Sequence, residues 1–286
     1  MRWQGGQRGG GNIEDRRGLG LGGGAVAGGG IGVVVLSLIG YFVFGIDPST
    51  TQQVASQFGG ASASQEGTQG TPEDQAGQFV DIVGGNINQV WASRLDGYTP
   101  PENIVIYTQG TQTGCGYGQS AMGPFYCPAD RQVFLDLSFW EEMETQLGAS
   151  GADFARAYVL AHEIGHHVQT LTGASERVQQ AQARASGEAE ANQYSVGLEL
   201  QADCYAGVWA ANAASVSNGE VAVDQADLEE GAKTAAAIGD DALQRRSGGQ
   251  VNPDGFTHGT SAQRVEALRR GYQSGDPAAC EGYTDV

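Results

Sequence analysis

The chain has 286 residues, enough for one globular domain together with a membrane anchor and a linker. Its 15 Lys and Arg stand against 33 Asp and Glu, and a net charge of −18 would repel a phosphate backbone, so no nucleic-acid partner is expected. Of the 46 glycines, 20 lie in the first 70 residues, which separates a glycine-rich beginning from a domain-like remainder.

An uncharged apolar run is the first long feature of the chain. The 22 residues 25–46 would span about 30 Å as a helix, the thickness of the hydrocarbon core of a bilayer, and so predict one transmembrane helix over residues 22–46. A cleaved signal peptide is the alternative, although the run is long for one. Arginines precede the run and no Lys or Arg follows it before Arg94, so residues 1–21 are expected to form a cytoplasmic arm. These features predict a single-pass protein of the cytoplasmic (inner) membrane with an extracytoplasmic domain and leave its oligomeric state open.

The folded domain is expected to begin after a linker. Residues 47–70 are rich in Ser, Thr, Gln and Gly and bury too little apolar surface to become ordered, so they predict a flexible tether. Pro72 then stands at a plausible helix start, and apolar residues follow at helical spacing from Phe79 to Trp91. The sequence therefore assigns residues 71–286 to one domain.

Four cysteines lie on the predicted outer side of the membrane, where disulfides persist. Cys115 and Cys127 flank a Gly- and Pro-rich segment that suits a stapled hairpin, and Cys204 would then hold the C-terminal tail through Cys280. This is one of the three pairings that four cysteines allow. A cysteine zinc site is a competing interpretation that lacks C-x-x-C spacing, and buried free thiols stay open.

The remaining patterns predict the fold class. Residues 104–107 and 132–137 have strand character, a helix is expected over 139–147, and most of 153–214 has helical character. We therefore expect an α+β domain, mostly helical, with a small β-sheet.

The strongest motif for chemistry is His162-Glu163-Ile164-Gly165-His166, which lies within a predicted helix. Residues four apart on a helix share a face, so both imidazoles can reach one Zn²⁺, and Glu163 lies beside it as a candidate general base. Three of the four histidines fall in this short stretch of an otherwise apolar helix, which a solvent-exposed face would not require. The motif predicts one zinc ion held by His162 and His166.

A catalytic zinc needs a third protein ligand. Glu199 is the candidate, because it lies on a second predicted helix, and Glu188 and Glu190 are the rivals. Asp203 lies one turn after Glu199, where it could accept a hydrogen bond from the outer N–H of a ligand histidine.

These residues carry a resemblance. The segments MRWQGGQRGGGNIEDRRG, HEIGHHVQ and LELQADCYAGVWA resemble the bacterial family of neutral zinc metallopeptidases over nearly the whole chain. More distantly, H-E-x-x-H, E-x-x-A-D and the later Thr257, His258 and Arg264 resemble membrane peptidases related to the CAAX prenyl protease and its heat-shock relatives. The resemblance implies Glu199 as third ligand and a zincin-like core, with the active helix beneath a small sheet whose edge strand holds an extended substrate.

Different roles are expected for the two remaining histidines. His258 could donate a hydrogen bond to the oxyanion formed during hydrolysis, or only pack against the following helix, and Arg264 is expected to be a structural partner. His167 points about 100° away from His166 on a regular helix and is not expected to share its ligand set.

The sequence thus predicts a zinc-dependent endopeptidase that acts on polypeptides. A zinc-dependent amidase acting on the cell envelope is the first alternative, because the same hydrolytic chemistry serves both. A catalytically silent scaffold stabilised by metal is the second, although a purely structural site has no use for the base Glu163.

Overall fold

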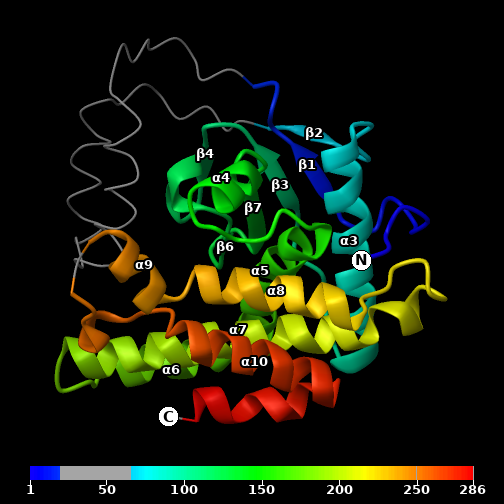
Figure 1. The fold of residues 1–286 in the computed structure, drawn as a ribbon. Coiled ribbons are helices and arrows are strands. Elements are labelled where there is room, and N and C mark those ends of the chain that lie inside the picture. The colour runs from blue at the N-terminus through cyan, green and yellow to red at the C-terminus, as the bar shows by residue number, and fades with distance from the viewer. Residues whose placement is uncertain (20–65, 249, 286) are drawn as a thin grey trace.

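The computed structural model describes residues 1–19, 66–248 and 250–285. In this part of the chain, a small β-sheet lies on one side of a thicker layer of helices (Figure 1). The architecture is α+β with more helix than strand, as the sequence predicted.

The main sheet has the strand order β2-β1-β3-β7-β6. β1, β3 and β7 are parallel, and the outer strands β2 and β6 run antiparallel to their neighbours. The strands are β1 (Ile13–Asp15), β2 (Thr68–Gln69), β3 (Ile104–Tyr107), β6 (Phe125–Cys127) and β7 (Gln132–Asp136), and a separate hairpin joins β4 (Gly110–Thr113) to β5 (Gly116–Gln119). The two predicted strands correspond to β3 and β7, whose apolar runs are buried as is typical of central parallel strands.

The longer helices surround one hydrophobic core. They are α3 (Gln75–Arg94), α4 (Phe139–Thr145), α5 (Asp153–Leu171), α6 (Ala174–Gln182), α7 (Glu188–Val216), α8 (Gln225–Ala237), α9 (Asp240–Arg246) and α10 (Ser261–Ser274). Short 3₁₀ segments are η1 (Ser120–Met122), η2 (Pro253–Gly255) and η3 (Pro277–Thr284).

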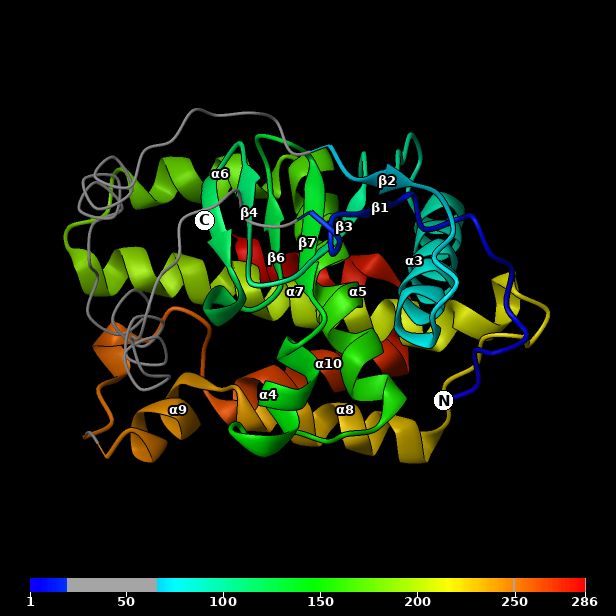
Figure 2. The same ribbon diagram turned by 90° about the horizontal axis from the view of Figure 1, so that it is seen from above.

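Helix α5 connects the two layers, because it packs against β6 and β7 on one side and against α7 on the other (Figure 2). Gly165 lies where α5 and α7 meet: a Cβ atom there would lie 3.2 Å from both Cα and O of Ala202. The glycine of the H-E-x-x-H motif therefore allows the two helices to approach closely beside the histidines.

The first residues of the chain are part of the domain, so their assignment to a separate arm was wrong. β1 pairs with β3, and Ile13 lies opposite Ile104. The buried Trp3 donates from Nε1 to Oδ2 of Asp153 over 2.7 Å, and the buried carboxylate of Asp81 accepts from the backbone N–H groups of residues 9 and 11. These partners lie far apart in sequence, where local patterns do not reveal them.

The predicted membrane location is also corrected. No helix among the described residues is long and apolar enough to cross a membrane. The predicted span, residues 22–46, and most of the predicted linker lie outside the described residues. In addition, β1 precedes that span and pairs with β3, which follows it, so the described residues on its two sides form one sheet and cannot face opposite sides of a bilayer.

All four cysteines form disulfides, with the pairing that the sequence analysis favoured. Cys115–Cys127 links the β4–β5 hairpin to β6, and Cys204–Cys280 links α7 to the C-terminal segment η3.

Candidate functional site

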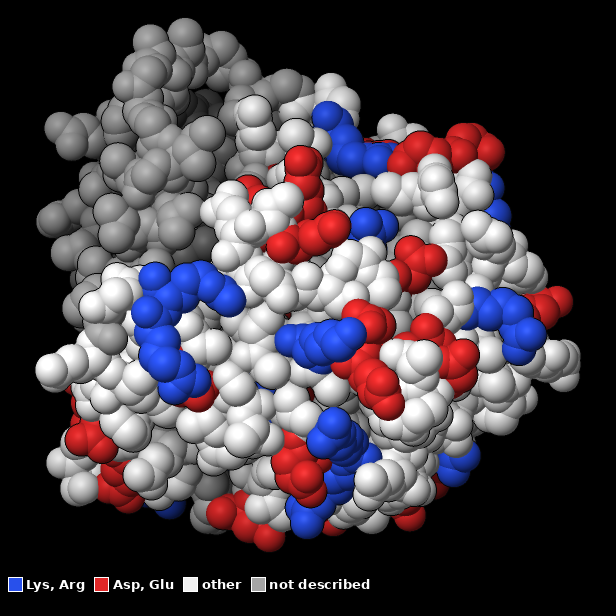
Figure 3. Space-filling view, in the orientation of Figure 1, with Lys and Arg blue, Asp and Glu red and all other residues white. Residues whose placement is uncertain are grey.

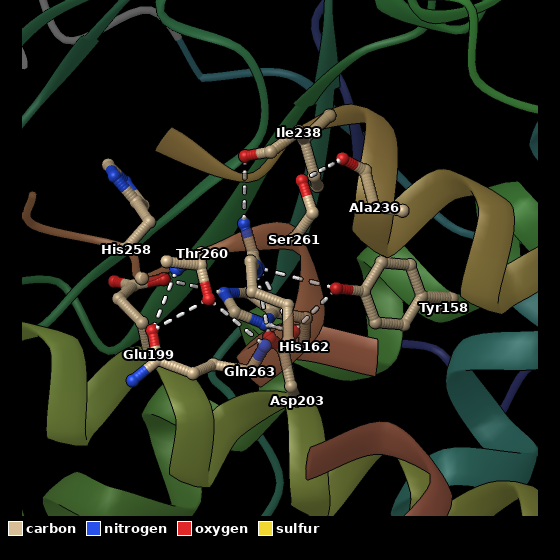
Figure 4. Close-up of polar contacts among 12 residues, drawn as sticks. Tyr158, His162, Glu199, Asp203, Ala236, Ile238, His258, Thr260, Ser261 and Gln263 are labelled. Atoms are coloured by element: carbon tan, nitrogen blue, oxygen red, sulfur yellow. Dashed lines mark hydrogen bonds and ion pairs between the residues drawn. The ribbon is translucent and has the colours of Figure 1, made fainter. Parts of the chain in front are cut away.

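Three side chains from two helices converge at the centre of the molecule. His162 and His166 project from α5, and Glu199 projects from α7. Nε2 of His162 lies 3.2 Å from Nε2 of His166 and 3.1 Å from Oε2 of Glu199, and Nε2 of His166 lies 3.5 Å from Oε1 of Glu199. Figure 4 shows His162 between Glu199 and Asp203.

These distances fit a tetrahedral zinc site. Two ligand atoms that each lie about 2.0 Å from a tetrahedral zinc ion are about 3.3 Å apart, close to all three separations in this cluster. Two imidazole nitrogens and one carboxylate are also a donor set found in catalytic zinc sites. A single proton could join only two of the three side chains in a hydrogen bond, whereas a single metal cation could be bound by all three. The residues present therefore fit zinc, with a fourth position left for water.

Asp203 fixes the orientation of His162. Its Oδ1 lies 2.8 Å from Nδ1 of His162 and accepts from the Tyr158 hydroxyl over 2.5 Å. Arg264 donates to the same carboxylate from Nε over 2.8 Å and from Nη2 over 2.9 Å. Because an ionised carboxylate only accepts, Nδ1 of His162 carries the proton and Nε2 is directed at the cluster.

Charge and burial set the protonation states of these groups. Burial opposes ionisation of Asp203, but Arg264 and His162 outweigh it and lower its pKa to about 2. Burial also disfavours a charged His162, yet Asp203 and Glu199 raise its pKa to about 10, so a metal must displace a proton from Nε2. For Glu199, burial is outweighed by the nearby histidines, led by His166, which hold its pKa well below the usual range.

Glu163 lies one residue after the candidate ligand His162 and is almost fully buried. Burial raises its pKa to about 7; the Glu199 carboxylate acts in the same direction and His162 in the opposite one. A carboxylate that titrates near neutrality is suited to take up and return a proton.

The other predicted residues lie around this cluster. Figure 4 shows the ring of His258 apart from the contacts that join His162, Asp203 and Tyr158. Nδ1 of His258 lies 3.0 Å from Oγ1 of Thr257 and 3.3 Å from Oδ1 of Asp240. Burial tends to lower the pKa of His258, but Glu199 and Asp240 raise it above its ordinary value.

His167 is buried and does not join the ligand set. Its Nε2 donates to the Thr99 carbonyl over 2.7 Å, and its Nδ1 lies 3.0 Å from the Tyr126 hydroxyl. The side chain therefore ties α5 to strand β6. The rival ligand Glu190 lies at the beginning of α7, where it accepts from Ser186, and Glu188 is exposed there.

Two residues that sequence patterns did not reveal support the candidate ligands, Gln169 directly and Tyr158 through Asp203. Tyr158 donates to Asp203, and Gln169 accepts from Nδ1 of His166 over 2.9 Å. Both lie on α5 at helical spacing from a ligand, one turn before His162 and nearly one turn after His166. That spacing was the available signal, but a Tyr or Gln on a helix has too many ordinary uses to be singled out by it.

Comparison with known proteins shows the family of the chain. The sequence model of the family described as "putative neutral zinc metallopeptidase" matches residues 1–283. The chain is 44% identical to the uncharacterized protein YpfJ of Escherichia coli strain K12, over 99% of both chains. It is 41% identical to the uncharacterized protein Rv2575 of Mycobacterium tuberculosis strain H37Rv, over 72% of this chain and 70% of that protein. No solved structure matches, so the zincin-like fold and the likeness to the CAAX-type peptidases stay predictions. The extent of the family match establishes that the chain belongs to the neutral zinc metallopeptidase family.

Proposed function

We propose that this protein is a zinc-dependent endopeptidase that hydrolyses polypeptides, with Glu163 as its general base. The observation that carries the proposal is the convergence of His162, His166 and Glu199 beside a buried glutamate. A metal that only stabilised the fold would not need such a base, and structural zinc sites are closed by a fourth protein ligand.

The residues would divide the work as follows. Zn²⁺ held by the three ligands would polarise the scissile carbonyl and lower the pKa of the attacking water. Glu163 would take a proton from that water onto its carboxylate and pass it to the departing amine, so its protonation state is restored at the end of the cycle. Asp203 would hold His162 in the Nδ1–H form throughout.

His258 is our candidate for stabilising the oxyanion. The electrostatic effect of the Glu199 carboxylate, which raises the pKa of His258, supports this proposal. Asp240 receives the backbone N–H groups of Thr257, His258 and Gly259, so it holds the segment that carries the ring. An imidazole N–H aimed at a developing negative charge would lower the barrier to attack.

Strand β6 is the proposed place for an extended substrate. It lies at one end of the main sheet and packs against α5. The backbone N–H of Tyr126 in β6 tends to lower the pKa of Glu163, and β6 packs against α5, the helix that carries this base. A polypeptide that added a strand to β6 would gain main-chain hydrogen bonds with little dependence on its sequence.

The test is hydrolysis of an unfolded protein, such as casein, by the full chain with one equivalent of zinc. The full chain is required because β1 is part of the sheet. We expect Glu163→Gln to retain zinc and to lose at least about 100-fold in rate, the usual size of a general-base contribution. Glu190→Gln, which changes a glutamate outside the ligand cluster, is the matched control and should cut like the wild type. Zinc binding without cleavage by the wild type would contradict the endopeptidase assignment.

A further inference from the structure

A chain of buried amides runs from the ligand His166 to the C-terminal segment. Gln169 lies next to His166, Gln201 lies next to Gln169, and both side chains are buried. Gln201 in turn contacts η3, the segment that the Cys204–Cys280 disulfide joins to α7. None of these contacts is needed to complete the ligand set, so their arrangement requires its own explanation.

Backbone carbonyls fix the direction of the hydrogen bonds that these two amide side chains make. Nε2 of Gln169 lies 2.7 Å from the carbonyl oxygen of Leu198, which can only accept, so the amide nitrogen must face Leu198. Oε1 of Gln169 therefore faces Nδ1 of His166. Nδ1 must carry the proton, which leaves the lone pair on Nε2 directed at the metal position.

The second amide is oriented in the same way. Nε2 of Gln201 donates to the carbonyl of Cys280 over 3.2 Å and to Oγ1 of Thr284 over 2.9 Å. Its Oε1 therefore faces Nε2 of Gln169, at 3.1 Å. The Thr284 hydroxyl lies 3.4 Å from the Glu281 carbonyl, to which it donates, so its oxygen accepts from Gln201.

Gln169 also joins the two helices that supply the ligands. It accepts from His166 on α5 and donates to the residue before Glu199 on α7. A displacement of η3 would move the partners of Gln201, then those of Gln169, and finally the ring of His166. The Cys204–Cys280 disulfide, which holds η3, is the first member of this series of contacts.

We propose that Gln169 and Gln201 are positioning residues that couple the disulfide-held C-terminal segment to His166, so that the Cys204–Cys280 bridge sets the zinc affinity of the site. The inference deepens the proposed function and rests on it. Reduction of the bridge would loosen η3 and lower the affinity for zinc, which makes the site sensitive to redox conditions.

The first test reads the tautomer of His166 in the metal-free full chain by long-range ¹H–¹⁵N NMR of labelled histidine at pH 8. The wild type should show the Nδ1–H form. Gln169→Leu should shift His166 toward the Nε2–H form, whereas Gln169→Glu, which keeps an acceptor, should restore Nδ1–H. Gln244→Leu removes another buried glutamine, one that accepts from Asn252, and should change nothing. An unchanged tautomer in Gln169→Leu would overturn the proposal, and because no metal is involved, this result does not depend on the proposed function.

The second test measures zinc affinity by competition with a chromogenic chelator. We expect a 10- to 100-fold loss for Gln169→Leu, on the order seen when partners of ligand histidines are removed. Gln201→Leu, Thr284→Val and the double variant Cys204→Ser/Cys280→Ser should each lose affinity, and Cys115→Ser/Cys127→Ser, the matched disulfide control, should keep it. If Gln169→Leu is weaker but Thr284→Val and the Cys204/Cys280 variant bind like wild type, coupling to the C-terminal segment is disproved. Failure of the wild type itself to bind zinc would instead contradict the proposed function.

Discussion

At the scale of single residues, the site depends on one buried carboxylate. Asp203 receives hydrogen bonds from His162, Tyr158 and Arg264, and none of these four side chains is exposed. Asp203 and Arg264 compensate each other's charge in a place that water does not reach. Removing one partner would leave the other as an unpaired buried charge, which is a large cost.

This arrangement predicts strong coupling between Asp203 and Arg264. Asp203→Asn should lower the free energy of unfolding of the metal-free protein by about 3–5 kcal/mol, because Arg264 would be left uncompensated. Arg264→Met should also lower the free energy of unfolding, because Asp203 would be left as an unpaired buried charge. The double variant should lose clearly less than the sum of the two, as measured by urea unfolding. Losses that add to within about 0.5 kcal/mol would show that the two residues act independently.

At the scale of elements, the position of the ligands depends on how closely α5, α7 and α10 approach one another. α7 carries Glu199 and Asp203, and α10 carries Arg264. Gly271 of α10 lies against the α7 backbone: a Cβ there would lie 1.8 Å from the carbonyl oxygen of Cys204. No side-chain movement can relieve a contact with backbone, so the two helices would have to separate.

Gly271→Ala is therefore predicted to destabilise the domain and to weaken zinc binding. Overpacking of this kind costs about 1–3 kcal/mol, and a contact with backbone should lie at or above the upper end of that range. Thermal unfolding of the metal-free chain measures the first effect and chelator competition the second. Gly5→Ala is the control, because a Cβ at Gly5 would meet nothing within 4 Å. Equal melting temperatures for Gly271→Ala and wild type would contradict the close packing of α10 on α7.

At the scale of the whole molecule, the sequence predicted what local patterns encode. The α+β class, the strands over residues 104–107 and 132–137 and the pairing of Cys115 with Cys127 agree with the structure, because each depends on short-range periodicity or spacing. His162, His166 and Glu199 lie close together in the structure, as the motif and the resemblance implied.

The errors share one physical cause, which is contact between residues distant in sequence. The pairing of Ile13 with Ile104 joins the chain's beginning to its central sheet, and no local pattern in the first residues distinguishes such a strand from a free arm. The hydrogen bonds of Gln169 and Gln201 likewise depend on backbone carbonyls that only the fold brings near. On the face seen in Figure 3, acidic and basic side chains are interspersed over much of the surface.

X-ray absorption at the zinc edge of the zinc-loaded full chain would show whether His162, His166 and Glu199 hold one zinc ion. We predict one zinc per chain, surrounded by two imidazole nitrogens at about 2.0–2.1 Å and by oxygen, with no sulfur. Glu199→Ala should keep the imidazole signal while its affinity falls. Sulfur neighbours at about 2.3 Å, or a spectrum without imidazole, would place the zinc elsewhere and contradict the account.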